Sequence, residues 1–168
     1  MGVDTAAAAA CAQFSDTGTI GGVLLERNKV TNPFFDGIYA FLDIDNGWPR
    51  FQSVSSQAYL YYRVRTSEWI ISNYYEPDST ASSARIPCDS GSLPLGMKMW
   101  WASKQARAPQ TAVLMSSSLA APAEVAAAQA AMKAEREEAL SGIRAQLEGV
   151  TSIVVAGASN PQINGTCK

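Results

Sequence analysis

The clearest alternation of apolar and polar positions lies between Asn46 and Ile71. Asn46 and Gly47 both accept the positive φ that a type I′ turn needs, so they predict a β-hairpin. Residues 58–65 alternate as a strand does, with one face made of Leu60, Tyr62 and Val64 and the other of Tyr59, Tyr61 and Arg63. A polar break at 65–68 precedes a second apolar run at 69–71. This spacing is typical of an antiparallel meander.

Similar patterns predict strands at 23–27, 37–42 and 95–101. In the last of these, Leu95, Met97, Met99 and Trp101 recur with period two, and Trp100 falls on the opposite face. Residues 76–94 are rich in Ser, Pro, Gly and Asp, which favours a long loop that wraps the sheet edge or contacts a partner. We therefore expect a small antiparallel β-module over residues 19–102.

The remaining segments are an Ala-rich N-terminal segment (1–18), a linker (103–121), an α-helix (122–149) and a tail (150–168). Pro122 suits the first turn of the helix, and Gly149 suits its end. An apolar stripe on this helix contains Val125, Met132, Ala139, Ile143 and Leu147. The expected fold class is α+β: a small antiparallel β-sheet module followed by a long C-terminal α-helix and a short strand-like tail.

The module resembles one found in uncharacterised proteins of microalgae and other protists, often in tandem copies. The resemblance rests on four short motifs: Asn46-Gly47 with Pro49 and Phe51, Tyr59 to Tyr62, Trp69 with Ile71 and Ser72, and Pro94 with Trp100. Trp48 departs from this pattern, which usually has a basic residue there. Residues 159–167 also repeat the pattern of residues 31–39, so the tail resembles the start of a second module, with an unpaired strand at 153–156. The resemblance implies no known activity, and it suggests an organellar, photosynthetic assembly in a plastid.

The amino-acid composition argues against several classes of function. Lys and Arg number 13 against 15 acidic residues, so the net charge of -2 offers no basic field for nucleic acid or an anionic bilayer. The absence of histidine removes the usual general base of hydrolases and the commonest metal ligand. No apolar run is long enough for a transmembrane helix. Cys11, Cys88 and Cys167 allow one disulfide, involving Cys11 or Cys167, but we favour three reduced thiols.

Two short motifs match a catalytic or metal-binding pattern, but each is explained more simply as a loop or turn. Asp16-Thr17-Gly18 is the aspartic-protease triplet, but the sequence holds no second copy to share its proton, so we favour a loop. Asp43, Asp45 and Asn46 suggest a calcium loop, but Trp48 occupies the position that needs glycine. A hairpin turn is the better interpretation there. No cofactor, metal or catalytic residue is therefore expected.

The sequence favours a structural or accessory subunit that binds larger protein partners, rather than an enzyme. Tyrosine, tryptophan and arginine are enriched at interface hot spots. The candidate contacts on the sheet are Trp48, Tyr59, Tyr61, Arg63 and Trp101, and those on the helix are Val125, Met132, Ile143 and Leu147. The alternative is a small-ligand or carbohydrate-binding module that uses Trp48 and exposed tyrosines. An aspartic hydrolase is the remote alternative.

Overall fold

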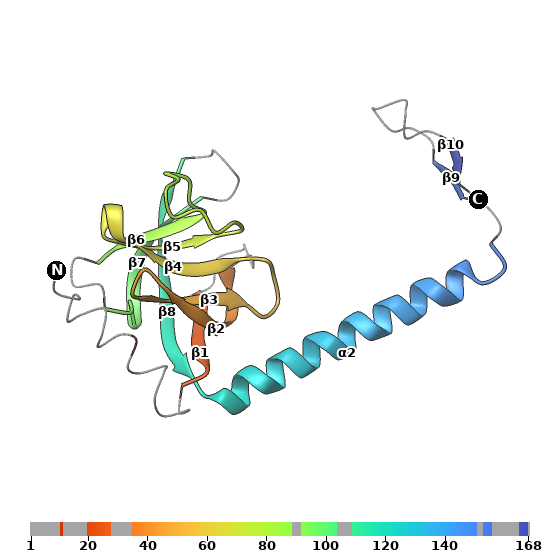
Figure 1. The fold of residues 1–168 in the computed structure, drawn as a ribbon, viewed down its shortest axis with the longest axis horizontal. Coiled ribbons are helices and arrows are strands. Elements are labelled where there is room, and N and C mark those ends of the chain that lie inside the picture. The colour runs from red at the N-terminus through yellow and green to blue at the C-terminus, as the bar shows by residue number, and fades with distance from the viewer. Residues whose placement is uncertain are drawn as a thin grey trace. The chain divides into compact units, whose positions relative to one another are not determined.

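Eight antiparallel strands form a closed barrel in the computed structural model, and a long helix follows them (Figure 1). The structure describes Cys11 and residues 20–27, 35–88, 92–103 and 109–150, and the backbone of 153–155 and 165–167. The strands are β1 (Gly22–Arg27), β2 (Gly37–Asp45), β3 (Trp48–Ser53), β4 (Tyr59–Arg63), β5 (Glu68–Ser72), β6 (Ala84–Pro87), β7 (Gly96–Ala102) and β8 (Thr111–Ala120). A 3₁₀ turn, η2 (Val64–Thr66), joins β4 to β5.

The expected antiparallel α+β fold is confirmed, but the sheet is larger than predicted and closes on itself. Each strand pairs with the next along the chain, and β8 also pairs with β1, from Gly22 opposite Ala120 to Arg27 opposite Met115. Closure gives every strand two neighbours, so the barrel has no exposed edge.

Two strands lie where the sequence favoured a loop and a linker. β6 interrupts the expected loop at 76–94, and β8 occupies most of the expected linker at 103–121. The linker prediction is wrong because the serine run at 116–118 resembles an irregular segment, yet Ser117 faces inward and its hydroxyl donates to the carbonyl of Pro94. The β-module therefore extends to Ala120 rather than to residue 102.

The Asn46-Gly47 hairpin is confirmed. Asn46 has φ of 49° and Gly47 has φ of 83°, and the flanking residues Asp45 and Trp48 pair directly. Between Phe41 and Asp43 the pairing shifts register, which marks a β-bulge. The tight turn at Asn46-Gly47 and this bulge together fix the position of the β2–β3 hairpin tip.

Aromatic side chains fill much of the barrel interior. The buried cluster comprises Val23, Leu25, Phe35, Tyr39, Trp48, Phe51, Ala58, Leu60, Trp69, Ile71, Ala84, Ile86, Trp100, Ala102 and Met115. The partly buried Tyr62 packs against this cluster: its ring centroid lies 4.2 Å from that of Trp48 and 5.6 Å from that of Trp69. Trp48 was expected in a binding patch at the turn tip, but it is only 6% exposed and belongs to this core.

The first unit of the chain, residues 1–132, ends within α2 (Pro122–Leu147). The Glu124 carboxylate accepts a hydrogen bond from the Ala121 amide at 2.7 Å, as in a capping box. Val125 is buried, and a Cβ added to Gly21 would lie 2.9 Å from its Cγ2 atom. The start of the helix is therefore packed against the chain just before β1.

Residues 133–168 form the second unit. The predicted helix is confirmed: α2 ends at Leu147, and Gly149 follows with φ of 81°, as in a left-handed C-terminal cap. β9 (Ile153–Val155) was expected to be unpaired, but it pairs with β10 (Gly165–Cys167). Most of the apparent repeat at 159–167 lies outside the described residues. Within the described part of the chain, no helix is both long and apolar enough to cross a membrane.

Gly22 provides a test of the close contact between β1 and β2. A Cβ at this position would overlap the carbonyl oxygen of Tyr39 on β2, a backbone atom that cannot move aside easily. We expect Gly22→Ala to lower the free energy of unfolding by about 1–3 kcal/mol, measured by chemical denaturation with tryptophan fluorescence. Gly142→Ala is the matched control, because nothing lies within 4 Å of its added Cβ; it should raise helix stability by about 0.5–1 kcal/mol. Equal midpoints for Gly22→Ala and the wild type would contradict the close approach.

Candidate functional site: the outer face of the barrel

The outer face of β4 and β5 holds an ion pair that is buried. Arg63 lies opposite Glu68 across the two strands, and the residues are 3% and 7% exposed. An arginine Nη1 atom lies 3.9 Å from the Glu68 Oε2 atom, so this is a long ion pair. The Arg63 Nε and Glu68 Oε2 atoms are buried without a hydrogen-bond partner among the described residues.

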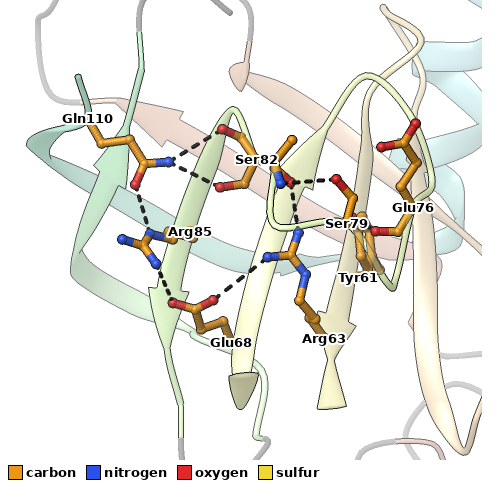
Figure 2. Close-up of polar contacts among 9 residues, drawn as sticks. Tyr61, Arg63, Glu68, Glu76, Ser79, Ser82, Arg85 and Gln110 are labelled. Atoms are coloured by element: carbon orange, nitrogen blue, oxygen red, sulfur yellow. Dashed lines mark hydrogen bonds and ion pairs between the residues drawn. The ribbon is translucent and has the colours of Figure 1, made fainter. Parts of the chain in front are cut away.

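Residues 73–83, the segment between β5 and β6, cover this outer face; we call them the covering loop. The Arg63 Nη2 atom donates to the carbonyl of Ala81 at 2.8 Å, and the hydroxyl of Tyr61 donates to the carbonyl of Glu76 at 3.3 Å. Figure 2 shows the Arg63 guanidinium reaching from β4 to the loop. Tyr61 is consequently 2% exposed. The expectation that Tyr59, Tyr61 and Arg63 form an open surface is wrong for Tyr61 and Arg63, and Tyr59 is half-buried.

Arg85 on β6 connects Glu68 to the chain before β8. Its Nη1 atom lies 3.0 Å from the Glu68 Oε1 atom, and its Nε atom donates to the Gln110 Oε1 atom at 2.8 Å (Figure 2). The Gln110 amide in turn donates to the Ser82 hydroxyl at 3.1 Å. The single negative charge of Glu68 is therefore shared between Arg63 and Arg85. The Arg85 side chain is 45% exposed.

A second polar group holds the start of the covering loop on β2 and β3. The Arg50 guanidinium binds the Asp43 carboxylate through two hydrogen bonds and lies 4.3 Å from the centre of the Tyr75 ring. The hydroxyl of Tyr75 donates to the carboxylate of Asp45. Burial, then the hydrogen bond to Asp45, raises the pKa of Tyr75 above its ordinary value. The carboxylates of Asp43 and Asp45 are thus bound by Arg50 and Tyr75. Among the described residues, no cluster of side chains could hold a metal ion.

The outer face of β7 and β8 is apolar and open. Met97 is 57% exposed, Met99 52%, Trp101 46% and Leu114 37%. Met99 pairs directly with Leu114 across the strands, and Trp100, which points the other way, is fully buried in the barrel interior. We call these four exposed residues the β7–β8 face. Arg85 lies beside it, as the cross-strand partner of Trp101.

The predicted site residues lie in four places. Trp48 is in the core, and Tyr59, Tyr61 and Arg63 lie under or beside the covering loop. Trp101 lies on the β7–β8 face. On the helix, Val125 is buried, Met132 is half-buried, and Ile143 and Leu147 are exposed. The structure therefore gathers none of the expected sheet residues around Trp101.

Met97, Met99 and Leu114 were not among the predicted site residues. The signal for the two methionines was present, because they share the strand face of Trp101 opposite Trp100. Leu114 lay in the expected linker, so its pairing with Met99 had no sequence signal. The Asp16-Thr17-Gly18 triplet lies outside the described residues, as does the side chain of Cys167, so the protease and the cysteine pairing stay predictions.

Compared with models of protein families, with curated proteins and with solved structures, the chain matches none.

The buried ion pair predicts a strong asymmetry between single and double substitutions. Arg63→Met leaves Glu68 buried with Arg85 as its remaining partner, and we expect the free energy of unfolding to fall by about 3 kcal/mol. The double variant Arg63→Met with Glu68→Met removes both charges and should recover most of that loss. Arg65→Met, at an exposed arginine on η2, is the control and should stay within about 0.5 kcal/mol of the wild type. Denaturant titration measures all three. A double variant less stable than Arg63→Met would contradict this account.

The raised pKa of Tyr75 predicts a loss of stability in alkaline solution. An unfolded tyrosine ionises near pH 10. The folded state resists this ionisation, so Tyr75 contributes stability below about pH 10 that is lost as the pH rises further. The free energy of unfolding should fall more steeply with pH in the wild type than in Tyr75→Phe, by up to about 1.4 kcal/mol per pH unit. Tyr74→Phe, at a ring 68% exposed, should keep the wild-type slope; equal slopes for Tyr75→Phe and wild type would disprove the role of Tyr75.

Proposed function

We propose that the chain is a non-catalytic binding module that attaches to a protein partner through the β7–β8 face. The observation that carries the proposal is the group of four large apolar side chains, each more than a third exposed, on two adjacent strands. Leaving such a group in water forgoes the free energy that its burial would give, about 25 cal/mol for each Å² of apolar area. Contiguous exposed apolar patches commonly mark interaction sites.

The chemistry of the face favours an apolar protein surface as its occupant. Methionine side chains adapt to irregular surfaces, and tryptophan is the residue most typical of interface hot spots. Trp101 also carries an indole N–H group that can donate to an acceptor on the partner. A net charge of -2 argues against an anionic bilayer or nucleic acid as the occupant.

The helix supports a second contact. Leu140, Ile143 and Leu147 are 44%, 51% and 45% exposed, and their spacing of three and four residues places them along one side of α2. This stripe retains Ile143 and Leu147 from the sequence prediction, while Val125 is already packed inside the first unit. A helix with three exposed apolar side chains along one side can lie in an apolar groove on a partner. Given the resemblance to microalgal modules, we propose an organellar assembly as the first place to look.

The other two functions have less support. The carbohydrate-binding alternative cannot use the surface predicted for it, because Trp48 is in the core and Tyr61 lies under the covering loop. The hydrolase depends on Asp16, which lies outside the described residues.

A charge placed on the β7–β8 face should release the protein from its complex. We expect the tagged chain, expressed in its own cells, to elute from gel filtration in a complex larger than its own 17.9 kDa. Met99→Glu should shift it to the monomer mass, because a buried unpaired carboxylate is costly in an apolar interface. Val64→Glu is the matched control: Val64 is 56% exposed but lies on η2, away from the face.

Two results would contradict the proposal. One is an unchanged complex with Met99→Glu when circular dichroism shows that the variant is folded. The other is self-association of the purified wild-type chain that Met99→Glu abolishes, since the face would then bind a second copy rather than another protein.

A further inference from the structure

A cavity of about 570 Å³ opens on the outer side of the barrel, beside Arg85. The covering loop contributes both of its ends to the wall, and β5, β6 and the segments that flank β7 and β8 supply the rest. Its lining residues are Ser72, Asn73, Tyr74, Thr80, Ala81, Ser82, Ser83, Arg85, Ser103 and Gln110. The volume falls within the range of about 300–1,000 Å³ that is usual for small-molecule sites.

The wall combines hydroxyl and amide groups with a larger share of apolar surface, and it carries one sign of charge. Serine and threonine hydroxyls and the amides of Asn73 and Gln110 can both donate and accept hydrogen bonds. Arg85 is the only charged residue among the described residues that line the cavity. Tyr74 adds an aromatic ring that is 68% exposed. This combination of many hydroxyl-binding groups and one aromatic surface suits a polyhydroxylated ligand such as a sugar.

Arg85 adds a preference for a negative charge. Two of its guanidinium nitrogens, Nη1 and Nε, bind Glu68 and Gln110 (Figure 2). Glu68 has both Arg63 and Arg85 within ion-pair distance, so this group of three carries one positive charge in excess. Gln110 is itself held by Ser82, which fixes the direction of the arginine. The guanidinium is therefore a positioned donor at the wall of the cavity, and carboxylates are its preferred partners.

We propose that this cavity binds an acidic sugar, a uronic acid residue either free or at the end of a polysaccharide. The sugar carboxylate accepts hydrogen bonds from the Arg85 guanidinium, its hydroxyl groups bind the serines and the two amides, and its ring lies against Tyr74. This site is distinct from the β7–β8 face, because none of the four residues of that face lines the cavity, although Arg85 is the cross-strand neighbour of Trp101.

Calorimetric titration of the full chain with glucuronate tests the site, with glucose and acetate as comparison ligands. We expect glucuronate to bind and both comparison ligands to bind at least tenfold more weakly, since each lacks one half of the recognised chemistry. Arg85→Gln should weaken glucuronate binding about tenfold or more, because a charge-assisted hydrogen bond is lost. Arg65→Gln removes an arginine that does not line the cavity and should leave the affinity unchanged.

Tyr74→Ala provides a variant that keeps the charges of the outer face. Its ring is largely exposed, so the barrel should fold normally, and glucuronate binding should weaken several-fold. A short oligouronate that binds more tightly than glucuronate would identify a polysaccharide end as the ligand, and equal affinities would identify the free sugar. The proposal is overturned if glucuronate does not bind, if glucose binds as well as glucuronate, or if acetate does. It is also overturned if both variants bind glucuronate like the wild type.

Discussion

The pairing of β1 with β8 is the constraint on which the rest of the barrel depends. It satisfies the backbone groups of the first and last strands, which would otherwise be open edges. On its other side β1 lies close to β2, where Gly22 leaves no room for a side chain beside Tyr39. A closed barrel of this size encloses a core that Trp48, Trp69 and Trp100 help to fill. Binding chemistry is thereby left to the outside of the barrel.

The outer face is divided between a covered part and an open part. Over β4 and β5 the covering loop excludes water from Arg63 and Glu68, and this desolvation is offset only partly by a long ion pair and the hydrogen bond to Ala81. These contacts fix the position of the loop. Arg63 holds it at Ala81, and Asp45 holds it at Tyr75, so both ends of the loop line the cavity in a fixed arrangement. Over β7 and β8 no described segment covers the apolar side chains, so they stay exposed.

Local features of the fold were predictable, and long-range ones were not. The hairpin at Asn46-Gly47 follows from backbone preference at two residues, and α2 follows from its alanines, Pro122 and Gly149. β8 was missed because its closure contacts with β1 join segments far apart in the sequence. The covered state of Tyr61 was missed for a related reason: alternation shows which side chains share a face, but not which loop lies over it. Met97 and Met99 were placed on the correct face, and only the structure shows that this face is open.

Arg85 lies at the boundary between the two proposed surfaces. It is the cross-strand partner of Trp101 on the β7–β8 face, and its guanidinium lines the cavity. A partner that packs against Trp101 removes water from the neighbouring guanidinium, which strengthens its attraction for a carboxylate in the cavity. Binding at the two sites is therefore expected to be linked. Linkage is reciprocal, so an acidic sugar on Arg85 would change the affinity of the face for its partner by the same factor. The shared residue, rather than any movement of the barrel, would carry this coupling.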